Sequence, residues 1–215
     1  MARSKPSDLH GNAPDSCPVA LLIIDAINDL EFPGGAGMLP RAVRMARNIA
    51  ALKRRATTLG IPTVYVNDNF GRWRSDFRRI VAHCLEDDVR GRPVAELVTP
   101  DENDYFVLKP KHSGFYNTTL DLLLEYLRVE TLILAGMATD VCVLFTAADA
   151  YMRDLRVIVA RDCVTAVTPA AHRAALAQMR KVLKAEVTPS RSLDPARLKR
   201  RSARRSRLGR PSRHE

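Results

Sequence analysis

The sequence predicts an α/β protein, a single three-layer α/β/α sandwich whose mostly parallel sheet is covered by helices on both faces. Strand-like apolar runs alternate with helical patterns from residue 19 to residue 187. The first run, Val19–Ile24, is apolar at every position, as expected of a strand buried on both faces. Such alternation gives parallel strands joined by right-handed crossovers. With 215 residues, 46% of them hydrophobic, the chain can bury the core of one such domain, which excludes wholesale disorder.

The first half of the chain supplies three strands and three helices. After the first strand, Gly34, Gly35 and Gly37 indicate a loop. Apolar side chains then recur at helical spacing, and Gly60 marks the end of that helix. The strands are expected at residues 19–24, 62–66 and 105–108, and the helices at 42–59, 76–85 and 93–98.

The second half continues the alternation without an internal repeat. Asn117 or Thr118 can cap the next helix, because a side-chain oxygen there accepts a bond from a free backbone N–H. Pro169 stands near the start of the last helix, where its missing N–H costs nothing. The helices are expected at residues 118–127, 140–152 and 169–183, and the strands at 131–135, 157–160 and 185–187.

Positive charge is concentrated at the C-terminal end. The formal net charge is +10, and residues 190–215 hold ten basic and two acidic residues, a net of +8, which leaves +2 for residues 1–189. We expect a polar extension at 1–17, a folded domain at 18–189 and a disordered Arg-rich tail at 190–215. The tail is either a solvated extension or a contact for nucleic acid phosphates, although no aromatic residue is interleaved for base stacking.

Cysteine content and apolar runs indicate the compartment. Four cysteines in a chain of this length do not form a disulfide scaffold, and Cys17, Cys84 and Cys163 are interpreted as structural. No apolar run approaches the ~18 residues of a membrane span. We therefore expect a soluble, reduced, cytoplasmic protein without membrane contact.

Three reactive side chains are expected at the carboxyl edge of the sheet, where ligands bind in open parallel sheets. Asp25 follows the first strand, Lys109 follows the third, and Cys142 lies at the start of the helix after the fourth. Partial desolvation raises the pKa of the Asp25 carboxylate, which suits it to act as a general base. Lys109 can polarise a partner. The helix N-terminus favours the thiolate form of Cys142, which is a nucleophile. Each residue alone has a simpler interpretation, as a loop carboxylate, a solvated lysine and a small core cysteine.

Three motifs resemble a known family. Residues 21–30 (LLIIDAINDL), 107–120 (VLKPKHSGFYNTTL) and 134–150 (LAGMATDVCVLFTAADA) are similar to motifs of the isochorismatase-like cysteine hydrolases, which include nicotinamidases and N-carbamoylsarcosine amidohydrolase. Residues 157–164 resemble the strand that closes the motif set. The resemblance covers about residues 18–188. It implies a six-stranded Rossmann-like sandwich with a catalytic set at Asp25, Lys109 and Cys142.

The same resemblance implies the groups around the nucleophile. A cis peptide between non-proline residues is expected to join Met137 and Ala138. It would turn the Ala138 N–H toward the substrate oxyanion, beside the N–H of Cys142, so that Ala138 and Cys142 form the oxyanion hole.

Two departures from the family pattern are informative. Nicotinamidases carry an Asp-x-His-x-His-like metal site after the second strand, but Asn67, Asp68 and Asn69 stand here and the nearest histidine is His83. We therefore expect no metal and no cofactor, which argues against a nicotinamidase. Ile27 replaces the glutamine that family members often carry two residues after the aspartate.

Aromatic and basic side chains near the rim are candidates for the substrate pocket. Phe70, Trp73, Phe115 and Tyr116 could wall it or could pack elsewhere. Arg72 and Arg74 flank the tryptophan and could hold a carboxylate. No role can be given to His83 or His112.

The expected activity is hydrolysis of a C–N bond, in an amide, a ureido group or a similar group of a small molecule, through a thioester on Cys142. One alternative is a vinyl-ether hydrolase of the isochorismatase type, for which Cys142 is dispensable. Another is an inactive member whose basic tail binds nucleic acid. Because family members are commonly oligomeric, we expect a homo-oligomer.

Overall fold

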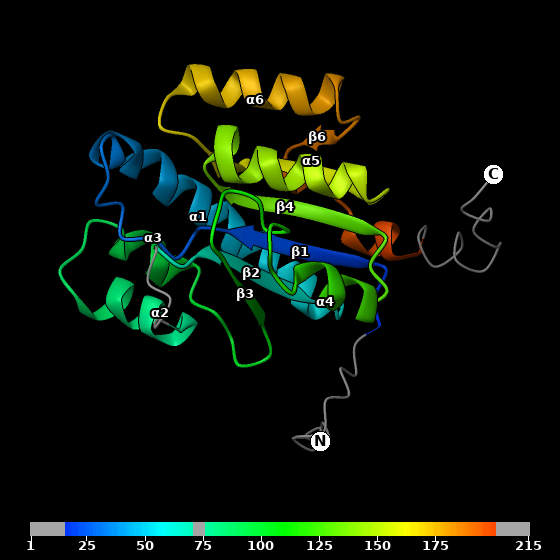
Figure 1. Ribbon diagram of the computed structural model, residues 1–215, viewed down its shortest axis with the longest axis horizontal. Helices are drawn as coiled ribbons and strands as arrows, with labels where there is room; N and C mark the ends of the chain where they lie inside the picture. The colour runs from blue at the N-terminus through cyan, green and yellow to red at the C-terminus, as the bar shows by residue number, and fades with distance from the viewer. Residues whose placement is uncertain (1–15, 71–75, 201–215) are drawn as a thin grey trace.

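The computed structural model describes residues 16–70 and 76–200, and it forms three layers with the sheet in the middle (Figure 1). All strand pairs are parallel, in the order β3-β2-β1-β4-β5-β6. The predicted α/β class and six-stranded sheet are confirmed. The strands are β1 (Val19–Ile24), β2 (Thr63–Asp68), β3 (Tyr105–Lys109), β4 (Thr131–Met137), β5 (Arg156–Thr165) and β6 (Glu186–Thr188).

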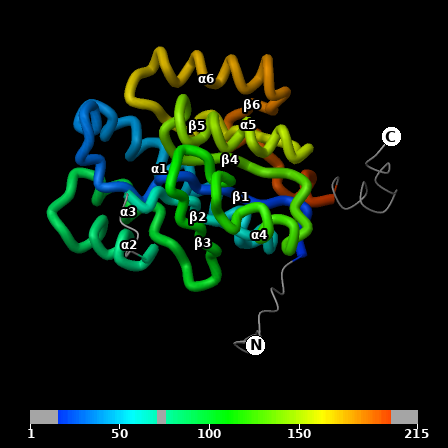
Figure 2. The backbone as a smooth tube through the Cα atoms, viewed as in Figure 1, coloured from blue at the N-terminus to red at the C-terminus, as the bar shows by residue number. Residues whose placement is uncertain are grey.

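Helices cover both faces of the sheet, as Figure 2 shows along the backbone. On one face lie α1 (Gly35–Thr58), α2 (Phe77–Glu86) and α3 (Arg92–Leu97). On the other face lie α4 (Leu120–Tyr126), α5 (Leu144–Met152) and α6 (Pro169–Lys181). Strand β1 is buried at every position, and its side chains alternate between the two apolar layers: Leu21 and Ile23 face α1, whereas Leu22 and Ile24 face α4 and α5.

Helix α1 begins earlier than the glycine-rich stretch predicts. The expected loop at Gly35 and Gly37 is wrong, because both residues belong to the helix, which starts after Gly34 with its φ of 91°. A Cβ on Gly35 would lie 2.0 Å from the carbonyl oxygen of Leu30. This glycine therefore permits a close approach of two backbone segments and does not indicate flexibility.

The segment that follows β6 differs from the expectation of disorder from residue 190. A 3₁₀ turn, η2 (Ser190–Ser192), precedes a helical stretch at residues 195–200, and Leu193 and Leu198 are buried beside α1. Arg55 of α1 donates to the carbonyl oxygens of Ser190 and Leu193. These two leucines bury apolar area that holds the segment on the domain, although the composition of the segment is mostly polar. Residues 201–215 and 1–15 lie outside the described residues.

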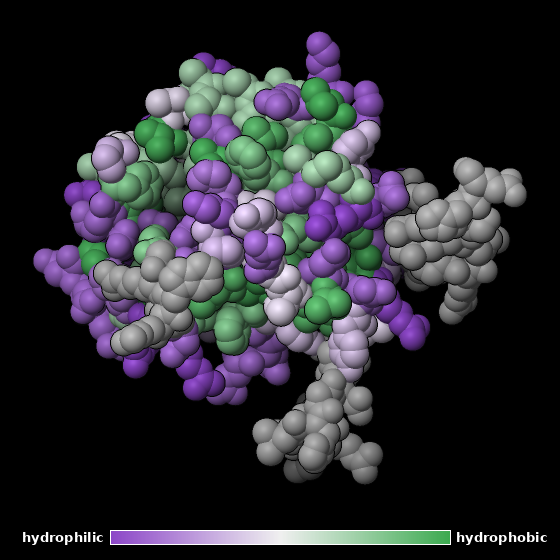
Figure 3. Space-filling model, in the orientation of Figure 1, coloured by the Kyte–Doolittle hydropathy of each residue, from purple (hydrophilic) through white to green (hydrophobic). Residues whose placement is uncertain are grey.

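The surface mixes polar and apolar residues. Figure 3 shows hydrophilic residues interspersed with hydrophobic ones on the face that carries α4, α5 and α6. Leu122, Phe145 and Met152 are among the exposed apolar side chains. Within the described residues, no helix combines the length and the apolar character that crossing a membrane requires.

Candidate active site

Asp25 occupies the turn that leaves β1. Its N–H still donates to the carbonyl of Val66, which extends the pairing with β2 by one residue. Its φ of 48° then turns the chain out of the sheet, a left-handed conformation that aspartate tolerates better than most residues. The side chain is buried at the carboxyl edge of the sheet, where the sequence predicts it.

Lys109 is the last residue of β3 and links the predicted catalytic groups. Its side chain is fully buried, with 0% exposure. Its Nζ lies 2.8 Å from Oδ2 of Asp25 and 3.5 Å from Sγ of Cys142. Three side chains that are distant in the sequence therefore lie together, as expected from the strand ends.

Close packing of β4 against β1 brings Cys142 to this cluster. Gly136 has a φ of 109°, and a Cβ there would lie 1.9 Å from the carbonyl oxygen of Ile24, the residue before Asp25. The next peptide bond, Met137–Ala138, is cis. Only glycine fits where these two neighbouring strands approach so closely.

Cys142 lies in a π-helical turn, η1 (Thr139–Val143), where the sequence predicts the first turn of an α-helix. The N–H of Val143 donates to the carbonyl of Ala138, a bond across five residues, and α5 continues from Leu144. Single π turns occur mostly at functional sites. The wider turn leaves the thiol partly exposed.

The surroundings keep the Cys142 thiol protonated, in contrast to the thiolate expected at a helix start. Burial and the neighbouring Asp25 carboxylate raise the pKa of Cys142 to about 12, although Lys109 opposes the shift. Burial also raises the pKa of Asp25 above its ordinary value, against the opposing effects of Lys109 and Cys142. A carboxylate with a raised pKa is a stronger base, and it is hydrogen-bonded to the thiol.

Burial alone would lower the pKa of Lys109, but its neighbours outweigh that effect. Asp25 is the strongest of them, followed by Cys142 and Asp68, and together they raise the pKa of Lys109. The ammonium group therefore stays charged between two carboxylates and a sulfur atom.

Asp68 belongs to this cluster, and the sequence analysis missed it. Its carboxylate Oδ2 lies 3.5 Å from Nζ of Lys109, and its backbone N–H donates to Oδ1 of Asp25 at 2.6 Å. The neighbouring Asn67 is fully buried and donates from Nδ2 to the carbonyl of Ile27. The position of Asp68 at the end of β2, next to the strand that precedes Asp25, was the available signal.

The pocket candidates separate into three groups. Phe115 is a core residue, because its ring is buried in the layer beneath α4 and α5 and is covered by the Arg153 guanidinium at 4.6 Å. Phe70 and Tyr116 are exposed. Trp73 lies outside the described residues.

The two histidine candidates have other neighbours than Asp25, Lys109 and Cys142. Arg72 and Arg74 lie outside the described residues. His83 lies between Asp29 and Asp87 on α2, which raise its pKa, and the His112 ring lies 5.5 Å from that of Phe145.

Cys17, Cys84 and Cys163 are free thiols and are buried, as expected of structural cysteines. Among residues 16–70 and 76–200 no group of three or more His, Cys, Asp or Glu side chains is arranged to hold a metal ion. The absence of a metal and of a cofactor stays a prediction.

Comparison with known proteins identifies the family. Residues 19–192 match the family model described as the isochorismatase domain. The chain is 38% identical over 169 residues to the uncharacterized isochorismatase family protein YaaI of Bacillus subtilis, with 79% of this chain and 92% of that protein covered. It is 29% identical over 195 residues to the ureidoacrylate amidohydrolase RutB of Methylobacterium radiotolerans, which covers 77% of this chain and 74% of that protein.

A solved structure agrees with these matches. The crystal structure of N-carbamoylsarcosine amidase from Thermoplasma acidophilum superimposes with a TM-score of 0.62 and 29% identity, and covers 82% of this chain and 98% of that one. The family resemblance predicted from the motifs is confirmed. The chain therefore belongs to the isochorismatase family of hydrolases.

Proposed function

We propose that this hydrolase cleaves a C–N bond of a small amide or ureido compound through a thioester on Cys142. The observation that carries the proposal is the position of the Lys109 ammonium, which lies within 3.5 Å of both the Asp25 carboxylate and the Cys142 sulfur. Two relatives support the bond type, since one is named an amidohydrolase and the other an amidase.

The first half of the reaction forms the thioester. The Cys142 thiol passes its proton to the hydrogen-bonded Asp25 as the sulfur attacks the substrate carbonyl, because a thiol with a pKa of about 12 is not ionised beforehand. The carbonyl oxygen gains the negative charge, and the N–H groups of Ala138 and Cys142 hold it. Asp25 then protonates the leaving nitrogen as the C–N bond breaks.

The second half releases the acid. Asp25, again a carboxylate, takes a proton from water, and the resulting hydroxide attacks the thioester carbonyl. The C–S bond breaks, and the proton returns from Asp25 to sulfur, which restores the thiol. Lys109 keeps Asp25 oriented throughout, and Asp68 adds a second anchor for the Lys109 ammonium.

Turnover of a panel of amides, ureido compounds and hydroxamates tests the proposal. We expect Cys142→Ala to abolish release of the amine or ammonia, because it removes the nucleophile. The control, Cys163→Ala, removes another free thiol, which is buried on β5, and is expected to retain activity.

The alternatives give different results in the same assay. A vinyl-ether hydrolase would act on an isochorismate-type substrate with full activity in Cys142→Ala. An inactive member would release nothing from any compound. It would instead bind nucleic acid in a salt-sensitive way that deletion of residues 201–215 removes.

A further inference from the structure

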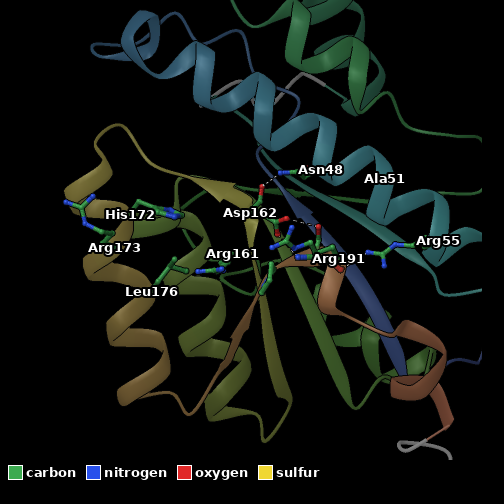
Figure 4. Close-up of a pocket in the computed structure, with 11 residues that line it drawn as sticks. Asn48, Ala51, Arg55, Arg161, Asp162, His172, Arg173, Leu176 and Arg191 are labelled. Carbon is green, nitrogen blue, oxygen red and sulfur yellow. Dashed lines mark hydrogen bonds between the residues drawn. The ribbon is translucent and has the colours of Figure 1, made fainter.

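A basic cleft lies between α1, β5 and α6, apart from the catalytic cluster (Figure 4). Its cavity measures about 820 Å³. A smaller cavity of about 210 Å³ adjoins it and shares Asn48, Asp162 and His172 with it. The basic side chains that line the two cavities are Arg41, Arg44, Arg55, Arg161, His172, Arg173 and Arg191.

Most of these arginines have no carboxylate partner in the part of the chain that the structure describes. Arg161, Arg173 and Arg191 make no ion pair and no side-chain hydrogen bond to residues 16–70 or 76–200. Some arginines elsewhere in the described residues do have carboxylate partners, as Arg153 with Asp121 and Arg156 with Glu186. The cleft therefore concentrates uncompensated positive charge.

Asp162, the one carboxylate that the described residues contribute to the lining, is already engaged. Asp162 accepts from the N–H of Ser190 at 2.6 Å and from its hydroxyl at 2.9 Å, and the Asp162 carbonyl accepts from Asn48. Its role is to fix the C-terminal segment against β5. In the smaller cavity, Nε of Arg41 is buried and has no acceptor among the described residues.

We propose that this cleft binds a small multivalent oxyanion of the triphosphate or tricarboxylate class. Guanidinium groups match the paired oxygens of both phosphate and carboxylate. Figure 4 shows the basic residues spread along the cleft, with Arg173 at one end and Arg55 at the other, so one ligand needs several anionic groups to reach them. Among the described residues, the lining contains no Phe, Tyr or Trp on which a base could stack, which disfavours a nucleic acid.

The cleft is distinct from the place where the substrate reacts. None of Asp25, Lys109 and Cys142 lines either cavity. His172 lines both cavities, and its Nδ1 lies 2.9 Å from the Thr139 hydroxyl at the start of the turn that carries Cys142. The oxyanion site therefore lies behind the nucleophile turn, one hydrogen bond away from it.

Titration calorimetry on the full chain tests this site, with sodium triphosphate and with citrate at constant ionic strength. We expect saturable binding at one site per chain, and weakening by about tenfold or more in the double variant R161Q/R191Q. The control R78Q/R128Q removes two exposed arginines of α2 and of the loop after α4, and should bind within about twofold of wild type. Because C142A should also bind normally, the result does not depend on catalysis.

The preferred anion identifies the source of the ligand: tighter binding of triphosphate indicates a phosphorylated metabolite, and tighter binding of citrate indicates a polycarboxylate. The proposal is overturned if neither anion saturates a site, or if R161Q/R191Q binds as tightly as wild type. It is also overturned if only a single-stranded oligonucleotide binds and R161Q/R191Q loses that binding.

Discussion

At the residue scale, the main feature is a thiol that keeps its proton beside a basic carboxylate. Asp25 raises the pKa of Cys142 through its charge and its hydrogen bond, while Lys109 lowers it. In the proposed reaction the nucleophile would therefore be generated only as the proton moves to Asp25, which would link attack to proton transfer.

Alkylation of Cys142 measures this effect. Because the pKa is about 12, we expect the rate with iodoacetamide to rise about tenfold per pH unit between pH 8 and pH 11, without a plateau near pH 9. Asp25→Asn removes the negative charge, so the pKa of Cys142 should fall and alkylation at pH 8 should become faster. Mass spectrometry of the Cys142 peptide measures the extent of alkylation. Slower or unchanged alkylation in Asp25→Asn would contradict the assignment of the raised pKa of Cys142 to the Asp25 charge.

Asp25, Lys109 and Cys142 could be found from the sequence because each stands at or near a strand end within a recognisable motif. Asp68 was missed because its stretch was considered only for the histidines that it lacks. The sequence left Phe115 open between the pocket and the core, since sequence position does not tell which way a rim side chain faces, and here the ring packs inward under Arg153.

At the scale of elements, apolar runs predict the strands well because both faces of this sheet are buried. The residues at which the helices start were harder to predict from the sequence. Gly35 lies inside α1 and approaches the backbone of Leu30, and the π-helical turn at Cys142 follows the close approach of β4 to β1 at Gly136. Neither close approach of the backbone can be read from the periodicity of apolar residues.

The close approach of Gly136 to Ile24 gives a stability prediction. Gly136→Ala places a Cβ against the carbonyl of Ile24 at a positive φ, so we expect a loss of about 3 kcal/mol or more in the free energy of unfolding. The matched control is Gly37→Ala in α1, where no atom lies within 4 Å and alanine should stabilise the helix by about 0.5–1 kcal/mol. Urea unfolding of both variants measures the difference in their free energies of unfolding. Equal stabilities would refute a steric conflict between a Cβ at position 136 and the Ile24 carbonyl.

At the scale of the whole molecule, buried thiols make the fold sensitive to alkali. Burial raises the pKa of Cys84 and Cys163 to about 12, from an ordinary value of 9.0. Between these values the thiols ionise in the unfolded chain but not in the folded one, so stability is full below pH 9 and falls as the pH rises toward 12. Each thiol contributes a loss of up to about 1.4 kcal/mol per pH unit.

Urea unfolding under reducing conditions at pH 8 and pH 10.5 checks this dependence. We expect the free energy of unfolding to fall with pH in the wild type and to fall less steeply in Cys163→Ala. An identical pH dependence of the free energy of unfolding in the two proteins would mean that Cys163 has the same pKa in the folded and the unfolded state. The expectation of a homo-oligomer also belongs to this scale and stays a prediction, which sedimentation of the full chain can test.

The most direct test of the account is the mass of the protein caught during turnover. An amide or ureido substrate is mixed with the full chain, and the reaction is quenched in acid within its first turnovers. The mass of the intact protein is measured by mass spectrometry, and digestion then locates any added group. The account predicts an added acyl group on Cys142, absent from Cys142→Ala. Steady product release from a chain that never carries an acyl group, with Cys142→Ala as active as wild type, would contradict it.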